Sequence, residues 1–414
     1  MPTPVLQQSS TQSQDDRDRN ANTAEPIHGH RTTFKALDGL RFLAAIAVVL
    51  FHYSPQVSHF GDLPKWTRSL IMIGPLAVPF FYVLSGFVLA HVYRQTAHSL
   101  MNRKWDFWRA RIARIYPAYL FAFLLFAPQA FVKYLFHPNH GGPSGLAVFA
   151  WSGSLYCAML QSWTSLSQAW NGPGWSVSVE AFFYFLFPWL LGMGLTAKSQ
   201  RSALLCRIVL LIPIIVTWAH LTHRIPENLW VGVIRNNPVF WLPAFLVGMS
   251  LTAYTGFWRR LGDRTATGIV LLLCSSVLFV TLATADNYKD LLIFGGLVPL
   301  LGFIILSFTH ETSHISRLMG SRILSNLGRA SYGLYIIQAP VWHYFRAALT
   351  YWHHRNTSAD VVSPIAFVIF VASLIGLSLL LNRYVEKPCS KFLMSITERG
   401  VNGQVSLSYK VTAT

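Results

Sequence analysis

The sequence predicts an all-α fold: a polytopic membrane helical bundle of about ten transmembrane helices with both termini in the cytoplasm. Of its 414 residues, 53% are hydrophobic and 12% are charged, whereas a soluble domain usually carries about 25% charged residues. Long stretches such as 208–218, 269–283 and 365–381 carry no charge at all. About 20 apolar residues cross the hydrocarbon core as a helix that satisfies its own backbone hydrogen bonds.

Ten apolar segments are long enough to be transmembrane helices, and each ends where charged or turn-forming residues interrupt the apolar run. They lie near residues 36–55, 70–92, 115–136, 176–195, 204–222, 237–255, 266–285, 290–309, 328–349 and 363–384. A further apolar stretch, 145–162, is broken by Gly and Ser and lies within a long polar loop. We interpret it as an interfacial or re-entrant segment rather than a span.

The chain divides into three parts. Residues 1–34 are polar and are predicted to be a disordered cytoplasmic tail. Residues 35–395 form the membrane domain, and 396–414 form a short C-terminal tail. With this topology the cytoplasmic segments hold about three times as many Lys and Arg residues as the outer ones, in agreement with the positive-inside rule.

The net charge of +17 does not indicate nucleic-acid binding, because the basic residues cluster in short loops between apolar segments. The four cysteines stand far apart and form no CxxC motif, so the sequence predicts neither a metal site nor a redox pair.

Two ionisable residues, Arg41 and His52, share the first predicted span. They are eleven residues apart, which is about 16 Å along a helix and close to three full turns, so both face nearly the same side. Arg41 is expected near the cytoplasmic end and His52 in the outer half. The alternatives are a snorkelling anchor for Arg41 and an interfacial histidine for His52.

Glu180 is the only one of the sixteen carboxylates that we place well within a span. The fourth span runs from the outside inward, so Glu180 is expected at about the depth of His52. A carboxylate beside a histidine is the usual arrangement of a general base, because it orients the imidazole and stabilises its charged form. A structural salt bridge is the alternative.

Arg111 and Arg114 lie three residues apart at the cytoplasmic start of the third span, on one helical face. Guanidinium groups match phosphate oxygens in bidentate geometry, so with Arg41 they are candidates for a phosphate clamp. Topology alone also favours basic residues at this position. Together with the deeper His52 and Glu180, the cluster favours a phosphorylated donor with a long thin arm, the shape of coenzyme A.

In its motifs the chain resembles the integral membrane acyltransferase type 3 family, from about residue 35 to 395. The matching segments are 36–41 with Asp38 and Arg41, the following His52, 80–87 with Ser85, 111–117, 175–180 with Trp175, Ser176 and Glu180, 331–335 with Tyr332, and 386–388. In this order and spacing the set is specific, although no single motif is.

The resemblance implies a ten-helix bundle that transfers acyl groups, often acetyl, to cell-envelope sugars or other small acceptors. It implies that His52 is catalytic and that Arg41, Arg111 and Arg114 hold the acyl-CoA. Ser176 and Glu180 match the Ser-x-x-x-Glu element of the family. Two departures exist: Gln338 stands where many members have a histidine, which makes nearby His343 a rival to His52, and no extracytoplasmic hydrolase-like domain is appended.

We therefore expect a membrane-bound O-acyltransferase that moves an acetyl group from acetyl-CoA to a hydroxyl of an exopolysaccharide, lipopolysaccharide or lipid-linked glycan. The expected location is the bacterial inner membrane, with lipid and polysaccharide-assembly proteins as partners. A proton-coupled transporter or flippase of a sugar or lipid-linked glycan is the alternative, since intramembrane His and Glu also form proton relays. The third hypothesis is a degenerate member of the family with a purely structural role.

Overall fold

The computed structural model describes residues 34–136, 143–194, 200–258, 260, 262–284, 288–309, 313–352 and 362–395, which pack as one unit from Phe34 onward. Within these ranges every regular element is helical, as predicted, and a single bridge between Val57 and Val362 is the one strand-like pairing. The predicted tails lie outside the described residues, apart from Phe34.

The α-helices follow one another along the chain with short connections. They are α2 Lys35–Tyr53, α3 Lys65–Ile71, α4 Ala77–Tyr93, α5 Ala97–Asn102, α6 Lys104–Phe136, α7 Pro143–Cys157, α8 Gly174–Gly192, α9 Gln200–Leu221, α10 Glu227–Leu229, α11 Pro238–Leu251, α12 Thr255–Trp258, α13 Asp263–Ala283, α14 Lys289–Leu291, α15 Val298–Ser307, α16 His314–Met319, α17 Arg322–Trp352 and α18 Pro364–Leu381. Three π-helical segments interrupt or extend them: η6 Trp230–Ile234, η9 Leu292–Gly296 and η10 Asn382–Glu386. The 3-10 segments are η1 Ser54–Gln56, η2 Phe60–Asp62, η3 Gly74–Leu76, η4 Arg94–Thr96, η5 Gln161–Trp163 and η7 Thr252–Tyr254.

All ten predicted segments are helical, but among the described residues seven helical segments are long and apolar enough to cross a membrane. A bent pair, Lys289–Gly296 with Val298–Ser307 at 56°, would make eight. The helices at the predicted spans 204–222 and 328–349 are not among them. The count of ten spans and the sides of the termini therefore stay predictions.

Helix boundaries differ from prediction where charged residues continue a helix. α6 begins at Lys104, so Arg111 and Arg114 lie about two turns inside it instead of at its start. The last span continues through η10 to Ser395 instead of ending near 384. Segment 145–162 contains α7, whose apolar part, Gly145–Cys157, is shorter than a full span.

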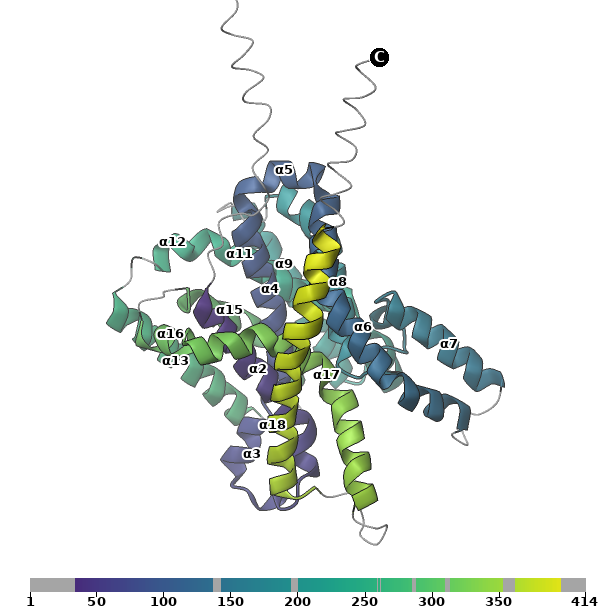
Figure 1. Cartoon of the computed structure of the whole chain (residues 1–414). Coiled ribbons are helices and arrows are strands. Elements are labelled where there is room, and N and C mark those ends of the chain that lie inside the picture. Colours follow the sequence, from purple (N-terminus) through teal and green to yellow (C-terminus); the bar gives the residue numbers. More distant parts are fainter. Residues whose placement is uncertain are drawn as a thin grey trace, which may run out of the picture. The chain divides into compact units, whose positions relative to one another are not determined.

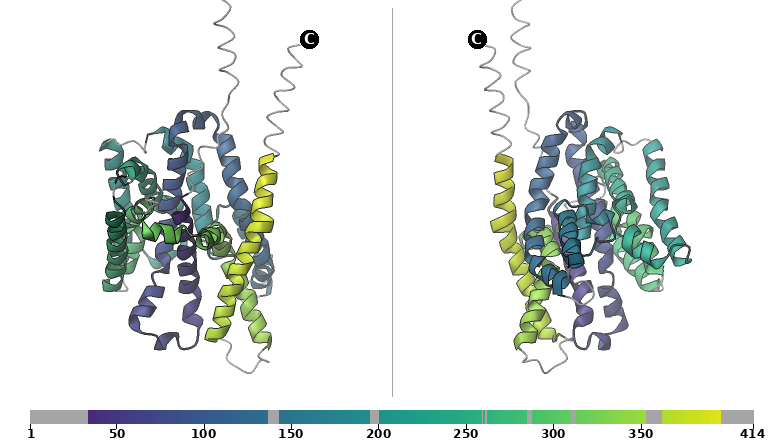
Figure 2. Two further views of the ribbon diagram at one scale, coloured as in Figure 1. Left: turned by 60° about the vertical axis from the view of Figure 1, so that its left-hand side comes forward. Right: turned by 90° about the vertical axis from the view of Figure 1, so that its right-hand side faces the viewer.

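The 31-residue helix α17 is not straight. Figures 1 and 2 show its first half lying across the bundle and its second half running beside the lower part of α18. Pro340 lies inside this helix, and an internal proline removes a backbone hydrogen bond and kinks the helix. The first half therefore reaches the interior of the bundle, where it contributes side chains to the site described below.

Glycines bring several helices into close contact, and two of these helix pairs contribute to the site described below. A Cβ on Gly86 of α4 would collide with the carbonyl of Phe245 in α11, and one on Gly248 of α11 would collide with the carbonyl of Val83. A Cβ on Gly328 of α17 would likewise collide with the Asp38 carbonyl of α2. Small residues allow membrane helices to approach until their backbones touch. These crossings fix α2 against α17 and α4 against α11.

Candidate active site

A cavity of about 220 Å³ lies between α2, α4, α6, α8, α17 and η10. A single water needs only about 10–15 Å³ measured in this way, so the cavity has room for the arm of a ligand. Its lining is unusually rich in charge for the interior of a membrane bundle. The charged residues that line it are Asp38, Arg41, Arg111, Arg114, Glu180, Arg329 and Glu386.

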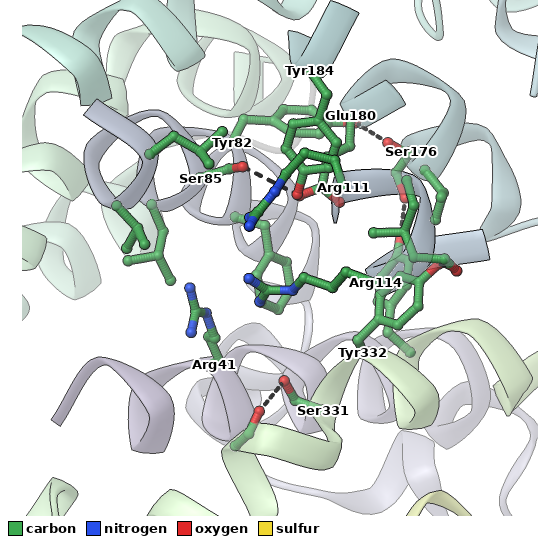
Figure 3. Close-up of a pocket in the computed structure, with 18 of the residues that line it drawn as sticks. Arg41, Tyr82, Ser85, Arg111, Arg114, Ser176, Glu180, Tyr184, Ser331 and Tyr332 are labelled. Carbon is green, nitrogen blue, oxygen red and sulfur yellow. Dashed lines mark hydrogen bonds between the residues drawn. The ribbon is translucent and has the colours of Figure 1, made fainter. Parts of the chain in front are cut away.

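The three predicted arginines meet in this cavity, although they come from two helices. In Figure 3 the side chains of Arg41, Arg111 and Arg114 extend into a common space. Arg114 is solvent-accessible despite its place within the bundle, because it faces the cavity. The structure thus gathers several guanidinium groups around one concave site, which is a suitable arrangement for binding an anionic ligand.

Each arginine is held in a different way. Arg41 Nη1 donates to Asp38 Oδ1 at 2.9 Å, one helical turn earlier. The guanidinium carbon of Arg111 lies 5.7 Å from the ring centroid of Phe107 and 6.0 Å from that of Tyr184. Arg111 Nε is buried and has no hydrogen-bond partner among the described residues. Since buried donors are normally satisfied, this Nε favours a ligand as its partner.

Glu180 belongs to the arginine cluster. Its carboxylate accepts hydrogen bonds from Ser85 Oγ, at 3.2 Å, and from the hydroxyl of Tyr184. Tyr184 is four residues later on α8 and therefore on the same face. Arg114 interacts electrostatically with Glu180, Asp38 and Glu386. Glu180 thus balances part of the positive charge and holds hydroxyl groups around the cavity.

Some of the other predicted motif residues line the cavity, and one packs behind it. Ser85, Ser176 and Tyr332 line the cavity. Ser176 Oγ lies 2.9 Å from the Tyr335 hydroxyl, and Tyr332 donates to the carbonyl of Ile115 at 2.8 Å. Trp175 is not part of the lining. It packs against Trp241 with ring centroids 5.7 Å apart, and its carbonyl accepts from Ser162 Oγ at 2.6 Å.

The start of α8 is anchored by a loop that folds back into the bundle. Gln161 is 0% exposed, and its Nε2 donates to the Tyr119 hydroxyl and to the Gly174 carbonyl, both at 2.9 Å. Asn171 is 3% exposed, and its Nδ2 donates to the Ile336 carbonyl of α17 at 2.8 Å. These bonds set the position of Ser176 and Glu180 relative to α17.

A second half-buried carboxylate, Glu386 of η10, faces the cavity beside Arg114. Asn382 Nδ2 donates to its Oε2 at 2.8 Å, while Oε1 is buried and has no hydrogen-bond partner in the described structure. Asp38 and Glu386 also lie on candidate spanning helices and line the same cavity. Asp38 is close to the start of α2, whereas Glu386 lies in the part of the last candidate span that continues through η10 beyond the predicted end. The prediction that Glu180 is the only carboxylate well within a span stays a prediction.

His52 is not part of the cavity lining. It is exposed on α2, with ring centroids 5.2 Å from Phe51 and 5.9 Å from Tyr53. The buried side chain of Gln338 and the main chain of Val48 are the groups that act electrostatically on its imidazole. Gln338 Nε2 donates to the Tyr335 carbonyl, while its Oε1 is buried and has no hydrogen-bond partner among the described residues.

The predicted contact between His52 and Glu180 is not found among the described residues. Glu180 pairs with Ser85 and Tyr184, whereas His52 faces Gln338. The prediction assumed that the start of α8 lies at the outer surface. Because Gln161 and Asn171 of the loop before α8 are buried, the carboxylate lies among the arginines that line the cavity instead. His343, the rival histidine, is exposed and packs edge-on against Phe126 with centroids 5.4 Å apart.

Comparison with known proteins agrees with this geometry. The model of the acyltransferase domain family matches residues 34–383, which is most of the chain. The chain belongs to this acyltransferase family. No solved structure matches it.

This acyltransferase is similar to several named relatives. It is 27% identical to acyltransferase MdmB of Streptomyces mycarofaciens over 86% of this chain and 92% of the relative. It is 25% identical to the peptidoglycan O-acetyltransferase OatA of Listeria monocytogenes, and 23% identical to the O-acetyltransferase OatA of Staphylococcus aureus. Each of these two alignments covers 86% of this chain, but the chain spans only 56% and 57% of the two OatA proteins.

Sequence reasoning did not name several residues that line the site of this acyltransferase, among them Tyr184, Arg329, Tyr335 and Glu386. Tyr184 could have been found from its spacing of four residues after Glu180 on a helix. Glu386 belongs to a motif that the sequence analysis singled out, but its depth depended on the extension of α18 by η10. Arg329 and Tyr335 reach the cavity only because α17 lies across the bundle.

Proposed function

We propose that this acyltransferase moves an acetyl group from acetyl-CoA to a hydroxyl of a cell-envelope or extracellular polysaccharide. The observation that carries the proposal is the guanidinium cluster of Arg41, Arg111 and Arg114 around one cavity, with the buried Arg111 Nε left for a ligand. Acetyl-CoA offers the phosphates that such a cluster binds, and a long arm that fits a deep cavity. The OatA relatives, named for O-acetyl transfer, support the acetyl group and the envelope acceptor.

His52 is proposed as the general base for the acceptor. The neutral imidazole takes the proton of the acceptor hydroxyl as that oxygen attacks the thioester carbonyl. The new C–O bond forms, the C–S bond breaks, and coenzyme A leaves as its thiolate. Gln338 is the group that orients His52, whereas Glu180 is a positioning residue for Arg114. With the predicted topology, the donor arrives from the cytoplasm and the acceptor from the outside, across the inner membrane.

Membership of an acyltransferase family favours acyl transfer over the alternative function, a proton-coupled transporter or flippase. Release of coenzyme A separates the two activities, since a flippase releases none. We expect purified protein in liposomes to release coenzyme A from acetyl-CoA only when a glycan acceptor is present. Loss of acetyl groups from the surface polysaccharide of cells that lack the protein would identify the acceptor.

His52→Ala is expected to lower acetyl transfer at least about 100-fold, the contribution typical of a general base. The measurement is coenzyme A release at saturating acetyl-CoA and acceptor. His343→Ala is the matched control and should retain most of the activity. Equal losses in the two variants, or a fully active His52→Ala protein, would contradict the role assigned to His52.

A further inference from the structure

The cavity and His52 are linked by one face of α2. Arg41, Ala44, Val48 and His52 succeed one another at spacings of three or four residues and therefore form a single row. Arg41 lines the cavity at one end of the row. His52 lies at the other end, about 16 Å away along the helix axis. The residues in this interval therefore separate the cavity from His52, the proposed general base.

A small apolar cluster fills the interval. Val48, Ala77 and Tyr335 are 2%, 6% and 8% exposed, and Ala44 and Phe81 pack against them. We call these five residues the apolar plug. Phe81 and Tyr335 also line the cavity, and their rings meet edge to face with centroids 6.1 Å apart. The plug is therefore the wall of the cavity that lies toward His52.

The plug is tied to polar groups on both of its sides. On the cavity side, the Tyr335 hydroxyl lies 2.9 Å from Ser176 Oγ. On the other side, Gln338 Nε2 donates to the Tyr335 carbonyl at 2.8 Å, and Gln338 interacts with His52. Val48 contacts His52 through its main chain. Tyr335 is thus held from both sides, Phe81 packs on its ring, and the small side chains Ala44 and Ala77 complete the cluster.

We propose that the apolar plug is the subsite for the acyl group of the donor and selects short acyl chains. The inference rests on the proposed function, because it assumes an acyl-CoA in the cavity. A thioester held by the arginine cluster meets the plug as it approaches His52, so its acyl chain lies against Phe81 and Tyr335, which line the cavity, with Val48 packed directly behind them. An apolar pocket discriminates about 10–200-fold for each methylene that it cannot accommodate. Two-carbon acyl groups are accepted and longer ones are excluded.

Val48→Ala tests the proposal, and Val49→Ala is its matched control. Val49 is the next residue on α2, is 0% exposed and makes the same change in volume, but it belongs neither to the plug nor to the cavity lining. Transfer from acetyl-, propionyl- and butyryl-CoA to one acceptor is measured for each variant. We expect Val48→Ala to raise the ratio of butyryl to acetyl transfer about tenfold or more, and Val49→Ala to leave it unchanged.

Ala77→Val is the complementary variant, because it narrows the same space. It should lower acetyl transfer while the affinity for coenzyme A itself, measured by calorimetry, stays within about twofold. If Val48→Ala is not obtained as a folded protein, Phe81→Leu serves as the widening variant. An unchanged butyryl-to-acetyl ratio in the widening variant overturns the plug as acyl subsite. Wild-type protein that uses no acyl-CoA at all would instead overturn the proposed function.

Discussion

At the scale of single residues, the site shows why charge can be concentrated inside a membrane bundle. Four arginines and three carboxylates line one cavity. Asp38 pairs directly with Arg41, and Arg114 interacts with Glu180 and Glu386. An isolated ionised residue at mid-membrane costs roughly 2.5–3.5 kcal/mol on insertion scales, and partners of opposite charge reduce this cost. The remaining positive charge is available to a phosphorylated ligand.

Arg111→Lys is expected to raise the KM for acetyl-CoA about tenfold with a smaller change in kcat. Lysine keeps the charge but presents no guanidinium fork and no Nε donor. It also loses the stacking on Phe107 and Tyr184. Initial rates of coenzyme A release against acetyl-CoA concentration give both constants. Arg109→Lys is the control, because Arg109 is exposed on the same helix and lies outside the cavity; an equal KM change there would refute the assignment.

Most of the candidate site was predictable from residue types and spacing. The arginines on α2 and α6 meet as expected, since a spacing of three fixes Arg111 and Arg114 on one helical face. The predicted contact of His52 with Glu180 is not found in the part of the chain that the structure describes, because it depended on how deep in the bundle α8 begins. That depth is set by buried amides such as Gln161 and Asn171, and a hydropathy pattern cannot reveal a polar loop that folds inward.

At the scale of elements, hydropathy predicted where the helices lie in the sequence. It did not predict the residues at which some of them begin and end, or the path of α17 through the bundle. The start of α6 was missed because charged residues from Lys104 to Arg114 continue the helix beyond its apolar part. The crossing path of α17 was missed because its amphipathic first half has the composition of a surface helix. In the structure several of its residues are buried, and Gly328 lies against the Asp38 carbonyl of α2. Tertiary packing, and not local pattern, decided both.

The anchoring of α8 to α17 can be tested with Asn171→Ala. The substitution removes the hydrogen bond to the Ile336 carbonyl and leaves that buried oxygen without its partner, a cost of about 1–3 kcal/mol. We expect a lower melting temperature in detergent and reduced acetyl transfer. Asn228→Ala, at an exposed asparagine, should change neither. A melting temperature equal to that of the wild type would show that the loop does not anchor α8.

At the scale of the whole molecule, topology determines whether donor and acceptor can approach from opposite sides. The bias of basic residues predicts both termini in the cytoplasm and the 137–175 loop outside. Labelling of single cysteines in a variant whose four native cysteines are serine tests this prediction. A membrane-impermeant maleimide should label Asn139→Cys in intact cells, and Ser13→Cys only after permeabilisation. Labelling of Ser13→Cys in intact cells would reverse the orientation and with it the assumed side of the donor.

The glycine contacts of α2 with α17 and of α4 with α11 restrict how this enzyme can deform during turnover. Backbones in direct contact cannot slide past one another without separating, so these two seams act as a fixed frame. Against η10 the nearest such contact is with a side chain and not with the backbone: a Cβ on Gly333 of α17 would lie 2.8 Å from Glu386 Oε1. Widening that admits a bulky donor is therefore expected on the flank formed by α6 and η10, while α2 stays in register with α17.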